Sequence, residues 1–266
     1  QLNAVCFALG GAIGLVWVAR SGGVRVLGAI PLKVYAFGTL GLFGYHFFYF
    51  SALRLAPPAE AGLIAYLWPL LIVLFSGLLP GERLRRGHVL GAGLAFGGAA
   101  LIVLKGGASF GGAAAPGYAL AFLCALTWSG YSVLSRRLGT TPTASVAVFC
   151  LASAALSTVA HLALEDTAWP ATSLGWVSML LLGVGPVGLA FYVWDIGVKR
   201  GDIQLLGTAS YAAPLLSTLA LIVAGAAEPT PLLALAALLI AGGAAFAARA
   251  GRRAAPSAPT AGESPP

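Results

Sequence analysis

Long apolar runs separated by short polar gaps dominate this chain. Nine runs are long enough to cross a bilayer, which takes about 20 mostly apolar residues. Only 9% of the 266 residues are charged and 59% are apolar, whereas a soluble domain carries about 25% charged residues. The pattern therefore predicts an all-α integral membrane protein whose spans cover residues 2–19, 34–53, 59–79, 87–104, 117–135, 142–164, 173–198, 203–225 and 231–248.

Basic residues fall unequally in the gaps between these spans. Counted on alternating sides, two of the fifteen, Arg54 and Lys105, lie on one side and thirteen on the other. Such a bias marks the basic side as cytoplasmic, so the C-terminus is expected inside. Because orientation accounts for the net charge of +7, we expect the lipid bilayer as partner and no nucleic acid. The thirteen are Arg20, Arg25, Lys33, Arg83, Arg85, Arg86, Arg136, Arg137, Lys199, Arg200, Arg249, Arg252 and Arg253.

An internal repeat relates the two parts of the chain. The stretch GLIAYLWPLLIVL (62–74) matches GTASYAAPLLSTL (207–219) at an offset of 145, and GGAA recurs at 97–100 and 242–245. The second copy has five spans, and by the same offset the first span of the first copy falls before residue 1. We therefore expect one more helix upstream, and five plus five helices as an inverted repeat. The expected units are a first repeat 1–105, a linker 106–116, a second repeat 117–250 and a disordered tail 251–266.

Each copy carries a proline inside a span. Tyr66, Trp68 and Pro69 stand in the first copy, and Tyr211 and Pro214 in the second. Proline breaks a helix, and broken backbone at membrane depth is tolerated where it lines a cavity or is buried in protein. A matched pair of interrupted spans points to a transporter's binding site. The alternative is a pair of structural kinks packed against neighbouring helices.

Polar aromatic residues gather in two other spans. In YHFFYF (45–50), Tyr45, His46 and Tyr49 form one patch at helical spacing, and a histidine within a span is a candidate functional residue. In TWSGYS (127–132), Trp128 and Tyr131 are three residues apart. Together they predict an apolar pocket with polar tips, suited to a large or aromatic side chain. The alternatives are an interfacial aromatic belt and ordinary interior packing.

The eighth and ninth helices of the expected ten add further candidates. Tyr192 aligns with the aromatic patch of the first copy, and Asp195 is a carboxylate well within a span. Asp195 either addresses a substrate ammonium or coupling proton, or pairs with Lys199 one turn later. Ser210 either binds a carboxylate or bonds its own helix backbone. The stretch GVGPVG predicts a hinge, formed by Gly183, Gly185, Pro186 and Gly188.

These motifs also carry a family resemblance. EAGLIAYLWPLLIVLF, FYVWDIGVKRGDIQLLGTASYAAPLLS and GAGLAFGGAALIVL resemble the EamA-type transporters of the drug/metabolite transporter superfamily, and within it the bacterial aromatic amino acid exporters. The resemblance covers nearly the whole chain except the tail. It implies ten helices, the bacterial inner membrane and export of small metabolites.

The sequence is thus interpreted as an exporter of aromatic or large neutral amino acids that works by alternating access. The first alternative is export of another small metabolite, such as a different amino acid, a nucleoside or a small drug. A channel or a membrane scaffold is a weaker alternative. We expect no enzyme activity, cofactor or metal, because no nucleotide loop or metal-ligand spacing is present. The oligomeric state stays open, and a monomer is compatible with the sequence.

Overall fold

The computed structural model describes residues 1–20, 23–104, 107 and 110–252. Lys105, part of the expected linker and residues 253–266 of the expected tail, Arg253 among them, lie outside the described residues. Within the described ranges every regular element is helical. The elements are α1 (Leu2–Arg20), α2 (Arg25–Gly28), α3 (Leu32–Leu55), α4 (Pro58–Ala65), α5 (Trp68–Ser76), α6 (Arg86–Val103), η1 (Gly112–Ala114), α7 (Ala115–Arg137), α8 (Ser145–Leu164), α9 (Ser173–Val184), the π-helical turn η2 (Gly185–Leu189), α10 (Ala190–Arg200), α11 (Ile203–Ala209), α12 (Ala212–Val223) and α13 (Pro231–Arg252).

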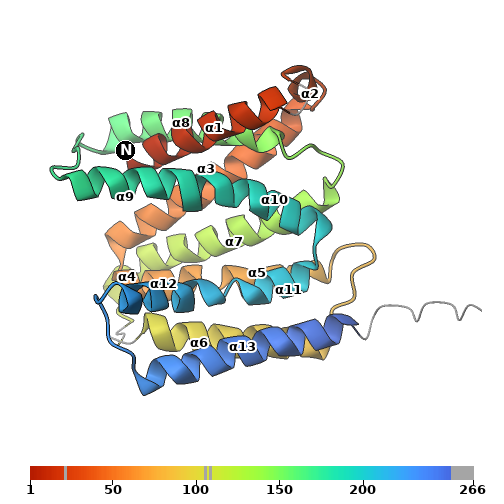
Figure 1. Ribbon diagram of the computed structural model, residues 1–266, viewed down its shortest axis with the longest axis vertical. Helices are drawn as coiled ribbons and strands as arrows, with labels where there is room; N and C mark the ends of the chain where they lie inside the picture. Colours follow the sequence, from red (N-terminus) through yellow and green to blue (C-terminus); the bar gives the residue numbers. More distant parts are fainter. Residues whose placement is uncertain (21–22, 105–106, 108–109, 253–266) are drawn as a thin grey trace, which may run out of the picture.

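The nine expected spans correspond to helices or pairs of helices. In the described part of the chain, eight helical segments are long and apolar enough to cross a membrane. The ninth, α3, is 24 residues long, about 36 Å at the rise of an α-helix, and it slants across the bundle from α2 to α4 (Figure 1). Three tyrosines and His46 lower its hydropathy. Its composition differs from that of the other spans because polar aromatic residues face the protein interior.

The helices lie side by side in a stack, with their ends at two opposite edges (Figure 1). Helices α1 and α8 pack together at one end of the stack, and α6 and α13 pack together at the other. Helix α7 lies between them and packs against α3, α4 and α5 on one side and α10 on the other. We call the edge that holds the ends of α3 and α8 the Arg54 end. The opposite edge, where α7 and α10 end, is the Arg136 end.

Glycine allows α6 and α13 to approach closely. A Cβ atom on Gly91 would lie 2.5 Å from the carbonyl oxygen of Gly243, and one on Gly98 would lie 2.7 Å from that of Ala236. Small residues of this kind let membrane helices pack backbone to backbone. By the 145-residue offset, Gly91 is equivalent to Ala236 and Gly98 to Gly243, so the contact is reciprocal. A two-fold axis requires such reciprocity. The inverted repeat stays a prediction, and this contact supports it.

Candidate functional site

Both proline-containing spans are interrupted at equivalent positions. The first breaks at residues 66–67, between α4 and α5, and the second at residues 210–211, between α11 and α12. Pro69 lies in the first turn of α5, where its missing N–H costs little because the first turn has no intrahelical acceptors. The backbone N–H of Leu70 donates to the Tyr211 hydroxyl at 3.0 Å. The two breaks therefore meet, and each helps to satisfy the polar backbone groups of this region.

A cavity of about 340 Å³ lies between α1, α3, α5, α7 and α9–α10. Its volume is in the range of small-molecule sites. His46 lines it, and the ring Nδ1 of His46 is 2.9 Å from the carbonyl oxygen of Leu42. Because a carbonyl only accepts, this contact places a proton on Nδ1. The bond fixes the orientation of the ring beside the two tyrosines of the same patch.

Aromatic rings make most of the cavity wall. The Trp128 ring is central, with ring centroids of Tyr45 at 5.0 Å and of Phe191 and Trp194 at 5.7 Å. Trp68 meets Trp194 edge to face at 5.4 Å. Such tilted and edge-to-face pairs are favourable aromatic geometries. The indole N–H of Trp194 donates to the Ser132 hydroxyl at 3.0 Å, so its polar atom is satisfied and its ring is held in place.

The structure brings together five of the thirteen predicted binding residues and one of the predicted hinge residues. Tyr45, His46, Tyr49, Trp68 and Trp128 line the cavity, and so does Pro186. All five binding residues come from the aromatic patches and from the start of α5. The two sequence patterns that placed aromatic residues with polar tips at helical spacing thus converge on one space.

The other predicted residues lie outside the cavity lining. Tyr192 is fully buried and donates to the carbonyl oxygen of Gly10 at 2.9 Å. Asp195 pairs with Lys199 at 2.8 Å, and Ser210 bonds the carbonyl oxygen of Leu206 in its own helix at 2.8 Å. For Asp195 and Ser210 the geometry matches the structural alternative. The remaining members of this group, which pack within or between helices, are Tyr66, Pro69, Tyr131, Tyr211 and Pro214.

Three of the four predicted hinge residues lie in η2, a π-helical turn between α9 and α10, and the fourth, Gly183, lies in the last turn of α9. A π-bulge inside a helix often marks a functional site. Here it packs against α1: a Cβ atom on Gly10 would lie 3.0 Å from the carbonyl oxygen of Val187. Motion at Gly183, Gly185, Pro186 and Gly188 stays a prediction.

Sequence reasoning missed several residues that line the cavity. Phe191 and Trp194 are the largest of them, and their spacing of three on α10 was a usable signal. Cys6 also lines the cavity, where its thiol is 3.7 Å from the carbonyl oxygen of Met179. The others are Asn3, Phe50, Leu182, Val187 and Ala190. Apolar residues of this kind cannot be told from lipid-facing ones in a sequence that is apolar on every side.

A wider space of about 680 Å³ at the Arg54 end shares Asn3, Phe50 and Leu182 with the cavity. We call it the vestibule. The cavity therefore adjoins open space at the Arg54 end.

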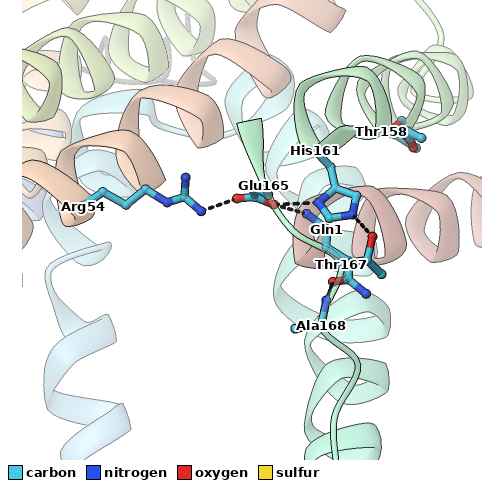
Figure 2. Close-up of polar contacts among 8 residues, drawn as sticks. Gln1, Arg54, Thr158, His161, Glu165, Thr167 and Ala168 are labelled. Atoms are coloured by element: carbon cyan, nitrogen blue, oxygen red, sulfur yellow. Dashed lines mark hydrogen bonds and ion pairs between the residues drawn. The ribbon is translucent and has the colours of Figure 1, made fainter. Parts of the chain in front are cut away.

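Glu165 organises one wall of this vestibule (Figure 2). Its carboxylate lies 2.9 Å from His161 Nδ1 and pairs with Arg54 at 2.7 Å. Both partners lower the pKa of the Glu165 carboxyl from its ordinary value. The second ring nitrogen of His161 is 2.9 Å from the Thr167 hydroxyl. The cluster ties the ends of α3 and α8 to the α8–α9 connection.

Comparison with known proteins identifies the family. The EamA-like transporter family matches residues 1–104 and 115–249. The chain belongs to the EamA-like transporter family. It is therefore a multi-pass membrane transporter rather than an enzyme.

Named relatives of this EamA-like transporter are similar over most or part of its length. It is 56% identical over 255 residues to the aromatic amino acid exporter YddG of Ancylobacter novellus, covering 95% of this chain and 88% of that protein. It is 26% identical to the aromatic amino acid exporter YddG of Salmonella typhimurium over 60% of this chain and 56% of that one. A crystal structure of a protein 55% identical to it superposes with a TM-score of 0.90 and covers 95% of this chain and 88% of that one.

Proposed function

We propose that this transporter exports aromatic or large neutral amino acids through the cavity by alternating access. The observation that carries the proposal is the cavity wall itself. Trp68, Trp128, Phe191 and Trp194 give it flat apolar surfaces, and His46 with its neighbouring tyrosines gives it hydrogen-bonding groups. Aromatic faces suit an aromatic side chain, which gains from edge-to-face contact beyond its buried area. Relatives that bear the name of aromatic amino acid exporters add support.

The orientation follows from the basic residues. The Arg136 end holds the ends of α1, α7 and α10 with their terminal basic residues, whereas the end of α3 brings Arg54 to the opposite edge. The positive-inside rule assigns the Arg136 end to the cytoplasm of the bacterial inner membrane. The C-terminus would then be cytoplasmic, and the vestibule would face the periplasm. Reciprocal packing of α6 and α13 supports the two inverted repeats on which alternating access of this kind rests.

Counterflow in proteoliposomes tests the substrate. Vesicles loaded with unlabelled phenylalanine receive traces of labelled phenylalanine, tryptophan, threonine or uridine in separate assays. We expect saturable accumulation of the two aromatic amino acids, reduced about tenfold in Trp68→Ala and His46→Ala, since a lost contact of about 1.4 kcal/mol is tenfold in affinity. Trp176→Ala is the matched control because Trp176 is exposed on α9 and away from the cavity lining.

Three outcomes separate the alternatives. Accumulation of threonine or uridine without the aromatic amino acids would replace the proposed substrate by another metabolite. Flux that does not saturate and shows no counterflow would indicate a channel. Equal loss in Trp176→Ala and Trp68→Ala would show that the substitutions act on the fold and would remove the cavity from the proposal.

A further inference from the structure

Between Trp194 and the Arg136 end, a layer of buried residues closes the bundle. Asp195 is 2% exposed, Val198 1% and Ile203 0%. The cavity adjoins the vestibule at the Arg54 end, whereas packed side chains separate it from this end. A transporter must open here at some point in its cycle, so the contacts that hold this end closed are of functional interest.

Arg136 lies at the centre of these contacts. Its Nη1 donates to the carbonyl oxygens of Val198 and Gly201, both at 2.7 Å. Its Nη2 pairs with the Glu82 carboxylate at 2.5 Å, and the Gln204 side-chain amide donates to the other oxygen of Glu82 at 3.2 Å. A guanidinium suits this arrangement because its planar fork donates in several fixed directions at once.

The partners of Arg136 come from different parts of the chain. Arg136 lies in the last turn of α7, and Glu82 lies in the connection between α5 and α6. Val198 and Gly201 belong to the end of α10, and Gln204 to the first turn of α11. The last carbonyls of a helix lack intrahelical donors, so Arg136 completes the end of α10 with its charge placed where the helix dipole favours it.

The same contacts join the two walls of the cavity. One wall is α3, α5 and α7, which pack together; the other is η2 and α10, followed by α11. Opening the cavity toward the Arg136 end requires α10 and α11 to move away from α7 and the α5–α6 connection. That movement breaks the Arg136 bonds to Val198 and Gly201 and the Gln204 bond to Glu82.

A second set of contacts supports the first. Asp195 of α10 pairs with Lys199 one turn later and accepts from the Thr143 hydroxyl at 2.8 Å. The Lys199 amine also donates to the Thr141 carbonyl oxygen at 2.9 Å. These bonds tie α10 to the connection between α7 and α8. The buried carboxylate of Asp195 thus belongs to the closure of this end and lies one residue beyond the Trp194 ring that lines the cavity.

We propose that Arg136, with Glu82 and Gln204, is the gate that holds the Arg136 end closed while the cavity adjoins the vestibule. The inference rests on the proposed transport cycle, and it adds residues that lie outside the substrate cavity. Removing the guanidinium frees α10 and α11 and shifts the population toward the form open at this end. A ligand or substitution shifts two states only through the free energy by which it distinguishes them, and Arg136 makes these cross-wall bonds only in the closed form.

Reaction of a reporter cysteine measures the opening directly. Ser135 is 5% exposed and precedes Arg136, on the same face of α7 as Trp128 and Ser132. The reporter is Ser135→Cys in a chain whose three cysteines are replaced by alanine, with the reaction followed using a membrane-impermeant maleimide added to either side of oriented vesicles. We expect Arg136→Ala to raise the labelling rate about tenfold from the Arg136 end, a shift of 1.4 kcal/mol in the equilibrium. Arg137→Ala is the matched control because Arg137 is exposed, and it should leave the rate unchanged.

Two conservative variants keep the test decisive if Arg136→Ala does not fold. Arg136→Lys retains the charge without the fork, and Glu82→Gln retains the shape without the charge; each should raise labelling by less than Arg136→Ala. Equal rates in the parent, Arg137→Ala and every folded gate variant would overturn the proposal. The labelling assay contains no substrate, so its failure leaves the proposed function standing. Counterflow of a different substrate leaves the gate standing, because the gate rests on the transport cycle and not on the identity of the substrate.

Discussion

Gly98 and Gly243 provide a sharp test of how α6 and α13 pack. A Cβ atom on Gly243 would lie 2.4 Å from the carbonyl oxygen of Gly91, and one on Gly98 would lie 2.7 Å from that of Ala236. A Cβ atom on either of the adjacent glycines, Gly97 or Gly242, would meet no neighbouring heavy atom within 4 Å. Alanine at each of the four positions therefore makes two matched pairs, one pair in each helix.

The expected magnitude follows from the difference within each pair. Overpacking a close contact costs about 1–3 kcal/mol, and here the contacted atoms are backbone, which cannot rotate away. Alanine also gains about 0.5–1 kcal/mol over glycine in a helix, but this gain is common to both members of a pair and cancels. Gly98→Ala should thus be less stable than Gly97→Ala by about 1–3 kcal/mol, and Gly243→Ala less stable than Gly242→Ala by a similar amount.

Thermal unfolding of the detergent-solubilised protein, followed by fluorescence-detected size exclusion, measures the differences. At about 2–4 °C per kcal/mol for a chain of this size, each clashing variant should melt roughly 2–12 °C below its partner. If the melting temperatures of Gly98→Ala and Gly243→Ala equal or exceed those of their partners, the helices separate at no cost and the close approach does not stabilise the fold. A loss in only one of the two pairs would contradict the reciprocal packing expected of an inverted repeat.

Two further predictions concern single polar groups. Tyr211→Phe removes the hydroxyl that accepts from the Leu70 N–H. It should cost about 0.6–1 kcal/mol, the span between the usual values for membrane and water-soluble proteins. An unchanged melting temperature would show that another group serves this N–H. His161 and Arg54 lower the pKa of the Glu165 carboxyl below its ordinary value of 4.5, so its stabilising contribution is complete above that pH and is lost as the pH falls below it. The parent should lose thermal stability over that range relative to Glu165→Gln, and parallel curves for the two proteins would contradict the Glu165 interactions.

Much of the fold could be predicted because membrane burial imposes strict lengths and composition. Each apolar run forms a helix or a pair of helices, and the repeated proline positions predicted two interruptions at equivalent places. The break itself differs from a kink in a continuous helix: α4 ends at Ala65 and α5 begins at Trp68, with Pro69 in its first turn. Proline is favourable there, so the residue starts the second half-helix.

The site could be predicted only in part because, in a membrane protein, apolar residues face both the lipid and the protein interior, so hydrophobicity does not distinguish the two. Tyr45, His46 and Tyr49 stood out as polar groups that a span accommodates at a cost, and they line the cavity. Phe191 is apolar and reads the same whether it faces lipid or substrate. Tyr192, next to it, aligns with the aromatic patch of the first copy, and its hydroxyl bonds the Gly10 backbone. Which polar group serves the backbone and which serves a ligand depends on helix rotation, which no local pattern sets.

The distribution of charge with depth bears on how such a cavity would handle an amino acid. Among the described residues, no Lys, Arg, Asp or Glu lines the cavity, whereas Arg54 with Glu165 and Arg136 with Glu82 form ion pairs toward the two ends. An ammonium and a carboxylate in the cavity would therefore meet hydroxyls, the His46 ring and water rather than fixed opposite charges. Neutral partners bind such groups less tightly than ionised ones. Weak binding of the charged groups in the cavity favours release of the substrate, which a carrier needs as much as recognition. Discrimination between side chains is then left to the aromatic walls.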